Sequence, residues 1–328
     1  MSFADLLAAL PTAAVLANLP TADPALIRDV RVGARYIVLD GMGPGEAVGT
    51  VRSVGDGAEL ELIDATGVTQ SVWFGPSGES RLGRWLLIRE VTHPVDELAS
   101  VVLPTTSHIL PVPTRIVGTA FFPGGSGLWR PAPARHLPAL PVGGVLIIGH
   151  DFGTVGQYVA ALRAGHEPVE RNATWRGLTA RLDRAGISLT SCFFTNAYLG
   201  LRVSESPTGA FPGRADEDYW AACSAVLERT IALQQPRLIV TLGRFVPALL
   251  AQLATASLTG WRGHQSFAAI DKASPIQRDV RFGDVTPTVV ALTHPSLGSA
   301  NAHRRRYEGI VRPGETVDDA LLRDALSV

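Results

Sequence analysis

Residues 145–154 are Val-Leu-Ile-Ile-Gly-His-Asp-Phe-Gly-Thr, an apolar run that stops at a glycine and is followed at once by an acid. The run over residues 145–148 is typical of a buried strand. Open α/β sheets place their ligand crevice just outside the carboxyl ends of such strands, and Asp151 falls at that point, between Gly149 and Gly153. An ordinary turn rich in glycine and aspartate has the same local pattern. The interpretation therefore depends on the later strands of the chain.

The second half of the chain alternates between strand and helix patterns. Strands are predicted at residues 145–149, 191–196, 238–242 and 288–292, and helices at 155–164, 175–185, 217–233, 245–253 and about 302–309. Strands separated by helices form a mainly parallel sheet with both faces covered. We therefore expect a three-layer α/β/α fold around a four-stranded, mainly parallel sheet.

The first half of the chain has a different texture. Residues 1–30 carry leucines at helical spacing between prolines, which indicates a helical arm, and residues 31–103 contain short β-type runs separated by glycine turns. We expect a small β-barrel or sandwich there. Residues 104–143, rich in proline and glycine, are predicted as a linker that partly packs against the following α/β/α domain at 144–312. Residues 313–328 are expected to form a terminal helix.

Composition limits the class of protein. Of the 328 residues, 46% are hydrophobic and 18% are charged, as in a globular chain. No segment has the length and apolarity of a membrane span, and the start lacks a signal-peptide pattern, so we expect a cytoplasmic protein with no membrane partner. The 29 Lys and Arg residues balance 30 Asp and Glu residues, so no overall basic excess indicates nucleic acid, although a local basic face stays open.

The chain lacks the usual cofactor motifs. Its two cysteines, Cys192 and Cys223, are too few for a cysteine metal site or an iron–sulfur cluster. The glycines at 149, 153 and 156 have the wrong spacing for a dinucleotide fingerprint, and no P-loop motif occurs. We expect no cofactor.

Polar residues follow each predicted strand. The first strand is followed by Asp151, the second ends in Asn196, the third is followed by Arg244 and the fourth by His294. Because the carboxyl ends of parallel strands meet at one edge of a sheet, an acid, an amide and an imidazole are predicted to converge there.

These motifs resemble those of the uracil-DNA glycosylase superfamily. Residues 149–154 look like a hybrid of that family's two first motifs, Gly-Gln-Asp-Pro-Tyr-His and Gly-Glu-Ala-Pro-Gly, and residues 294–299 are similar to its last motif, His-Pro-Ser-Pro-Leu-Ser. Phe194-Thr195-Asn196 resembles the strand that carries the base-reading asparagine. Residues 238–244 resemble the third strand of the Gly-Glu-Ala-Pro-Gly branch. The resemblance covers about residues 142–311.

The resemblance implies a catalytic role for two residues. Asp151 would position or deprotonate a water and stabilise the cationic sugar, and His294 would donate to a carbonyl oxygen of the departing pyrimidine. Cleavage of an N-glycosidic bond leaves positive charge on the sugar and negative charge on the base, so an acid on one side and a donor on the other lower the barrier.

It also implies residues that bind the base and the DNA. Asn196 would read the edge of the flipped base beside Gly149. Either Trp175 or Phe152 would stack on the face of the base. Trp175 belongs to a Trp-Arg-Gly that falls where that branch has Phe-x-Gly. Leu297 would enter the gap left by the base. Phosphates would be held by Ser296, Arg304, Arg305 and Arg306.

The same residues have structural interpretations. Asn196 can satisfy a strand end, Trp175 can belong to the core, His294 before a proline can form a turn, and residues 304–306 can be a solvated helix face. The chain also departs from the family pattern, with Phe152 in place of a proline and Gly153 where uracil-specific members carry a tyrosine. The four cysteines usual in the similar branch are missing.

Three functions remain open from the sequence. The first is a glycosylase that removes uracil or a related damaged base from single- or double-stranded DNA containing the lesion. The second is a catalytically weak nucleic-acid-binding module whose residues 31–103 recruit a protein partner. The third is a hydrolase of free nucleosides or nucleotides, against which salt-dependent DNA binding would count.

Overall fold

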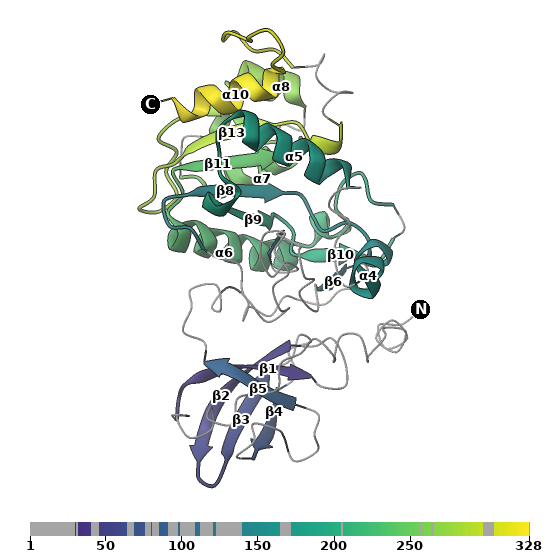
Figure 1. Ribbon diagram of the computed structural model, residues 1–328, viewed down its shortest axis with the longest axis vertical. Helices are drawn as coiled ribbons and strands as arrows, with labels where there is room; N and C mark the ends of the chain where they lie inside the picture. The colour runs from purple at the N-terminus through teal and green to yellow at the C-terminus, as the bar shows by residue number, and fades with distance from the viewer. Residues whose placement is uncertain are drawn as a thin grey trace.

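The computed structural model describes most of the second half of the chain and parts of the first (Figure 1). The described residues are 30, 32–40, 46–63, 69–75, 80, 85–90, 98, 109–111, 121–122, 140–164, 172–204, 206–255, 258–263, 266–297 and 305–327. The expected helical arm at residues 1–30, apart from Val30, and most of the expected linker lie outside them.

A five-stranded antiparallel sheet forms the first unit, in the order β4-β3-β2-β1-β5. Its strands are β1 (Arg35–Asp40), β2 (Glu46–Val54), β3 (Ala58–Ile63), β4 (Thr69–Phe74) and β5 (Trp85–Glu90). In β3, Leu60 and Leu62 are buried while the intervening Glu61 faces outward and bonds Arg52 at 2.8 Å. This alternation is what a half-buried strand requires, and the predicted β-rich unit is confirmed.

The second unit is a six-stranded sheet in the order β12-β13-β11-β8-β9-β7, whose central strands lie side by side in Figure 1. The four predicted strands are β8 (Val145–Gly149), β9 (Cys192–Asn196), β11 (Leu238–Leu242) and β13 (Thr288–Leu292), and they pair with one another in parallel. Every residue of β8, β9 and β11 is buried. A parallel sheet covered on both faces explains why these strands are continuously apolar.

Two edge strands extend this sheet beyond the four that were predicted. β7 (Phe121–Phe122) pairs in parallel with β9, and β12 (Ile276–Gln277) pairs antiparallel with β13. In addition, β6 (Ile109–Pro111) pairs with β10 (Gly200–Arg202) as a separate ribbon. Thus two short pieces of the expected linker pair with strands of the second half.

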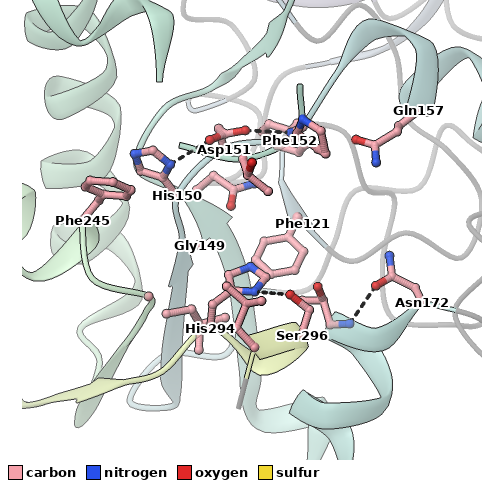
Figure 2. A pocket seen from close by; sticks show the side chains of 18 of the residues that line it. Phe121, Gly149, His150, Asp151, Phe152, Gln157, Asn172, Phe245, His294 and Ser296 are labelled. Carbon is pink, nitrogen blue, oxygen red and sulfur yellow. Dashed lines mark hydrogen bonds and ion pairs between the residues drawn. The ribbon is translucent and has the colours of Figure 1, made fainter. Parts of the chain in front are cut away.

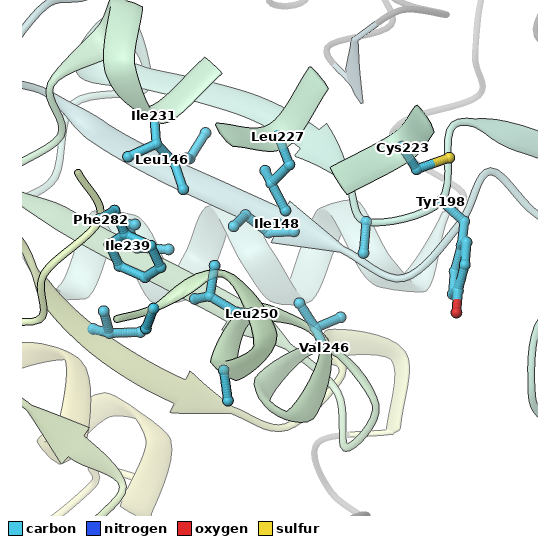
Figure 3. Close-up of a cluster of buried hydrophobic side chains, with 14 of the residues drawn as sticks. Leu146, Ile148, Tyr198, Cys223, Leu227, Ile231, Ile239, Val246, Leu250 and Phe282 are labelled. Carbon is cyan, nitrogen blue, oxygen red and sulfur yellow. The ribbon is translucent and has the colours of Figure 1, made fainter. Parts of the chain in front are cut away.

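Helices cover both faces of the sheet. One face packs against α5 (Ala173–Arg184) and α10 (Val317–Leu326) through Val145 and Ile147 of β8. The other packs against α6 (Glu217–Gln234), α7 (Val246–Leu253) and α8 (Phe267–Lys272) through Leu146 and Ile148 (Figure 3). Alternate residues of one strand therefore supply two cores, and the expected α/β/α fold is confirmed.

Two further helix predictions have different outcomes. The predicted helix at residues 155–164 is α4 (Val155–Ala164). The expected helix at about residues 302–309 is wrong over its described part, since residues 305–309 are not helical. The Arg305 side chain in that segment is bound to Asp271 of α8, to Asp318 of α10 and to the Ala291 carbonyl oxygen of β13, so its partners lie on three other elements and not on a helical turn of its own. Within the part of the chain that the structure describes, no helix is long and apolar enough to cross a bilayer.

Candidate active site

The polar residues predicted at the ends of β8, β9, β11 and β13 meet at one cavity of about 1310 Å³ (Figure 2). Pockets for small molecules usually measure roughly 300–1,000 Å³, so this one has room for a nucleoside and part of its neighbours. The cavity wall includes Gly149, Asp151, Phe152, Asn196, Trp175, His294, Ser296 and Leu297. The structure therefore brings together eight of the residues singled out in the sequence.

Gly149 is required by the close approach of Asn196. The two residues are paired in register at the ends of β8 and β9, and a Cβ on Gly149 would lie 2.1 Å from Oδ1 of Asn196. Asn196 is only 4% exposed, yet no described residue bonds its side-chain amide. A buried amide without a partner is costly unless a ligand or water satisfies it. This amide therefore has free hydrogen-bonding capacity at the cavity.

His294 presents an imidazole whose position is fixed from one side. Its Nδ1 lies 2.8 Å from Oγ of Ser296, and no described group bonds its Nε2. Burial lowers the pKa of His294 below its ordinary value, although the charge of Asp151 works in the opposite direction. A neutral imidazole that accepts from Ser296 at Nδ1 carries its hydrogen on Nε2 and can donate it to a carbonyl oxygen.

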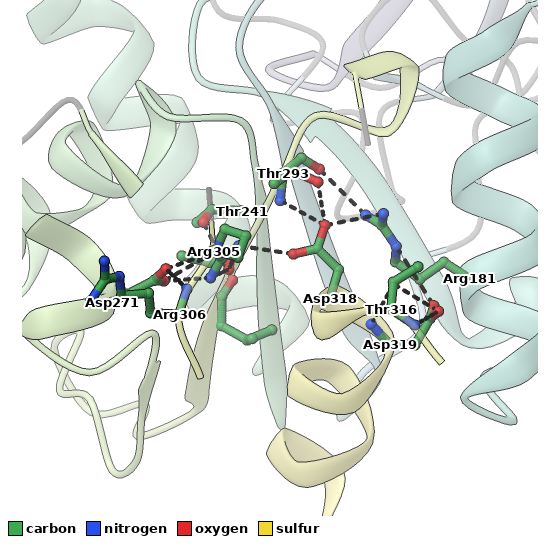
Figure 4. A network of polar contacts seen from close by, with 11 residues as sticks. Arg181, Thr241, Asp271, Thr293, Arg305, Arg306, Thr316, Asp318 and Asp319 are labelled. Atoms are coloured by element: carbon green, nitrogen blue, oxygen red, sulfur yellow. Dashed lines mark hydrogen bonds and ion pairs between the residues drawn. The ribbon is translucent and has the colours of Figure 1, made fainter. Parts of the chain in front are cut away.

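The loop that carries His294 is held from below by α10 (Figure 4). The carboxylate of Asp318 accepts from the backbone nitrogen and the hydroxyl of Thr293, and it also pairs with Arg181 at 3.1 Å and Arg305 at 2.8 Å. On the other side of the loop, a Cβ on Gly177 would lie 2.9 Å from the carbonyl oxygen of Pro295. Helices α5 and α10 thus fix the backbone on both sides of His294.

Asp151 lies at the predicted edge, but its carboxylate is fully engaged. Oδ1 accepts from the Gly153 nitrogen at 2.8 Å and from Nε of Arg202 at 3.0 Å, and Oδ2 accepts from Nη2 of Arg202 at 2.7 Å. Nδ1 of His150 lies 2.8 Å from the same Oδ2. Burial would raise the pKa of Asp151, but the hydrogen bonds and charges of His150 and Arg202 outweigh it and lower the pKa to about 2.

Arg202, at the end of β10, was missed in the sequence. Besides Asp151 it binds the carbonyl oxygens of Thr208, Gly209 and Ala210 at 2.9–3.1 Å, so all five of its N–H groups are used. Its side chain is 3% exposed. No motif marks this residue, because its partners come from segments distant in sequence from β10 or from the following loop.

His150 directly precedes Asp151, and the sequence assigned it no role. Its ring stacks on Phe245, with centroids 4.9 Å apart and planes inclined by 26°, and Arg244 lies over the same Phe245 ring at 4.7 Å. No described group bonds Nε2 of His150, and this atom is not buried. The ring is therefore held at Nδ1 by Asp151 and leaves Nε2 open on a residue that lines the cavity.

The aromatic rings at the cavity differ from the expectation. Trp175 is 1% exposed and packs against Phe194 and Phe121, so it belongs to the core, and its face is covered. Phe121, in β7, is partly buried and would lie 3.3 Å from a Cβ on Gly149. Phe152 also lines the cavity and is partly buried. Phe121 is thus a partly buried ring beside Gly149, and Phe152 is another partly buried ring of the cavity wall.

The residues expected to bind DNA divide into three groups. Ser296 is exposed at the cavity and Leu297 is 49% exposed, as a phosphate contact and a wedge require. Arg306 has an exposed side chain, whereas Arg304 lies outside the described residues. The expectation for Arg305 is wrong, because its side chain is 0% exposed and bound to Asp271, Asp318 and the Ala291 carbonyl oxygen.

The chain does not fit a cluster or metal cofactor. Cys192 and Cys223 are both buried, one in each of the two cores, and burial raises the pKa of their thiols to about 12 and about 11. Two protonated thiols on opposite sides of a sheet cannot hold an iron–sulfur cluster. No described group of three His, Cys, Asp or Glu side chains is placed to hold a metal ion.

The architecture is that of an α/β/α domain with a large, partly polar cavity at the carboxyl edge of its sheet. A family model described as the uracil DNA glycosylase superfamily matches residues 145–312, which is more than half of the chain. The chain belongs to this superfamily through its second half. No curated protein matches the sequence, and the first half has no family match. Membership supports a glycosylase-like activity on DNA in general terms.

Proposed function

We propose that this protein is a DNA glycosylase that hydrolyses the N-glycosidic bond of uracil or a related damaged base in DNA. The observation that carries the proposal is a pair of groups at the cavity that bond no described residue, the amide of Asn196 and Nε2 of His294. The amide and the imidazole can bind a pyrimidine whose negative charge grows as it leaves, and the nearby acid can stabilise the positive charge on the sugar.

The proposed role of each residue follows from the donor and acceptor atoms that it presents to the cavity. Asn196 offers a donor and an acceptor in one plane to the edge of a flipped base, and His294 donates from Nε2 to a carbonyl oxygen of the base. Phe121 or Phe152 covers a face of the base. Asp151 acts at the sugar, where its negative charge favours the cationic transition state and the attack of water.

The base range is expected to be broader than uracil alone. Gly153 stands where uracil-specific relatives carry a tyrosine that excludes the thymine methyl group. Its φ of 79° is strained for any residue with a side chain, so a tyrosine could not occupy this backbone position without rearrangement. A thymine in a G·T mismatch is therefore included among the substrates to be tested.

One observation favours the alternative of a catalytically weak DNA-binding module. The positive charge of Arg202 lies against Asp151 and offsets part of the negative charge that the cationic sugar needs. In that case the cavity would hold a base or a strand end without cleaving it, and the β-rich first unit would recruit a partner.

The test is incubation of the full chain with labelled oligonucleotides, single- and double-stranded, that contain uracil, hypoxanthine or a G·T mismatch, followed by alkali. We expect abasic sites with at least one substrate. The cleavage rate should fall by about 10²-fold or more in Asn196→Ala and in His294→Ala. Glu228→Gln, exposed on α6, is the matched control and should keep full activity. Salt-sensitive binding without any cleavage would replace the proposal with the binding module.

A further inference from the structure

The geometry of the Asp151 carboxylate raises the question of which group takes the proton from water. A carboxylate has about four lone-pair sites, and in Asp151 each is occupied, by Gly153, by His150 and twice by Arg202. An attacking water could bond this carboxylate only by displacing one of these donors. Asp151 therefore lacks a free site for the proton in this arrangement.

Few other groups at the cavity can accept a proton. Among the described residues that line it, carboxylates and imidazoles occur only in Asp151, His150 and His294. In the proposed function, His294 is the donor to the base and cannot also take the proton from water. His150 remains, with its Nε2 free of any described partner and not buried.

His150 has the support that a catalytic base requires. A hydrogen bond from Nδ1 to Oδ2 of Asp151 leaves the lone pair on Nε2, and the stack on Phe245 fixes the plane of the ring. Arg202 in turn holds Asp151 by a bidentate pair. An imidazole oriented by a buried carboxylate is an arrangement that activates hydroxyl nucleophiles in other enzymes.

We propose that His150 is the general base of the hydrolysis and that Asp151 and Arg202 are positioning residues that hold it. This inference rests on the proposed glycosylase function and replaces a direct proton transfer to Asp151. The bond from C1′ to the base nitrogen breaks, and its electron pair leaves with the base. The water oxygen bonds C1′, one water proton passes to Nε2 of His150, and the base takes up a proton from solvent.

The first test is His150→Gln in the full chain, measured by single-turnover cleavage of whichever base the wild-type protein removes. We expect the rate to fall by roughly 10²- to 10⁴-fold, while the affinity for the uncleaved oligonucleotide changes less than about twofold. Added imidazole should restore part of the rate to His150→Ala, which a merely structural role would not permit. Full activity in His150→Gln would overturn the inference and leave the glycosylase proposal standing.

The second test separates His150 from Asp151. If the two act as one unit, the loss of rate in the double variant His150→Gln/Asp151→Asn is clearly smaller than the product of the two single losses. If Asp151 takes the proton itself, each change lowers the rate by its own factor in both backgrounds. Retention of the thermal midpoint in His150→Gln excludes unfolding as the cause of any loss. A wild-type protein that cleaves no base would remove both proposals together.

Discussion

At the scale of single residues, the site depends on the close contact between Gly149 and Asn196, which leaves no space for a side chain at position 149. Gly149→Ala would place a Cβ 2.1 Å from Oδ1 of Asn196, so the amide or the strand end must move. We expect a loss of about 1–3 kcal/mol in unfolding free energy and weaker base recognition. Gly156→Ala in α4 is the control, because its nearest neighbour would be 3.9 Å away and alanine favours a helix. Chemical denaturation and the cleavage assay measure both effects.

A second prediction for a single residue concerns how Asp151 makes the stability of the fold depend on pH. Its folded-state pKa of about 2 lies below the ordinary 3.8, so the ionised carboxylate stabilises the fold above about pH 4, and this is lost as pH falls towards 2. A shift of nearly two units corresponds to about 2 kcal/mol. The unfolding free energies of wild type and Asp151→Asn should therefore differ by a constant amount from pH 7 to about pH 4 and converge below it. Convergence already near pH 6 would contradict this pairing.

At the scale of elements, α10 acts on the active site although it contributes no residue to the cavity wall. Asp318 binds the backbone and hydroxyl of Thr293 and neutralises Arg181 and Arg305, all of them buried. Removal of one partner from a buried ion pair costs about 3–5 kcal/mol. We expect Asp318→Asn to lower the unfolding free energy by a large part of that amount. We also expect it to lower the rate of base release, because His294 would be displaced.

A matched control separates this effect from a general loss of charge. Asp218→Asn removes a carboxylate from an exposed position in the first turn of α6 and should change stability by only a few tenths of a kcal/mol. Thermal unfolding and the cleavage rate of the remaining folded protein distinguish the two variants. Normal kinetics in folded Asp318→Asn would mean that the His294 loop holds its place without α10.

At the scale of the whole molecule, the sheet takes an edge strand from a segment that the sequence assigns to a linker. β7 pairs with β9 and brings Phe121 to the cavity, and β6 pairs with β10, which carries Arg202. A fragment of residues 144–328 lacks both strands, whereas a fragment of residues 105–328 keeps them. We expect the shorter fragment to be less stable and inactive, and the longer one to keep the cleavage activity of the full chain.

Circular dichroism and the oligonucleotide assay compare these fragments under the same conditions. Equal stability and activity of the two fragments would show that β6 and β7 are dispensable. Loss of activity in both would instead assign a role to the β-rich first unit, which the longer fragment also lacks.

The sequence by itself determined the four parallel strands of the main sheet, most of the helices around them and the residues at the strand ends. These features depend on local patterns, since apolar runs, glycine turns and polar residues after strands are all visible within a few positions. Asp151, Asn196 and His294 reach the same cavity because parallel strands end at one edge. The superfamily follows from the same stretches.

The tertiary structure alone decided which polar residues are free and which are paired. Arg305 resembles a phosphate contact in sequence, but Asp271 and Asp318 bury it, and Arg202 carries no motif yet occupies two lone pairs of Asp151. Both Trp175 and Phe121 border the cavity, but Trp175 is 1% exposed and packed in the core, whereas Phe121, from a segment without a sequence signal, is only partly buried. Such pairings join residues far apart in the chain, and only packing determines the partner of a buried charge or the open face of a ring.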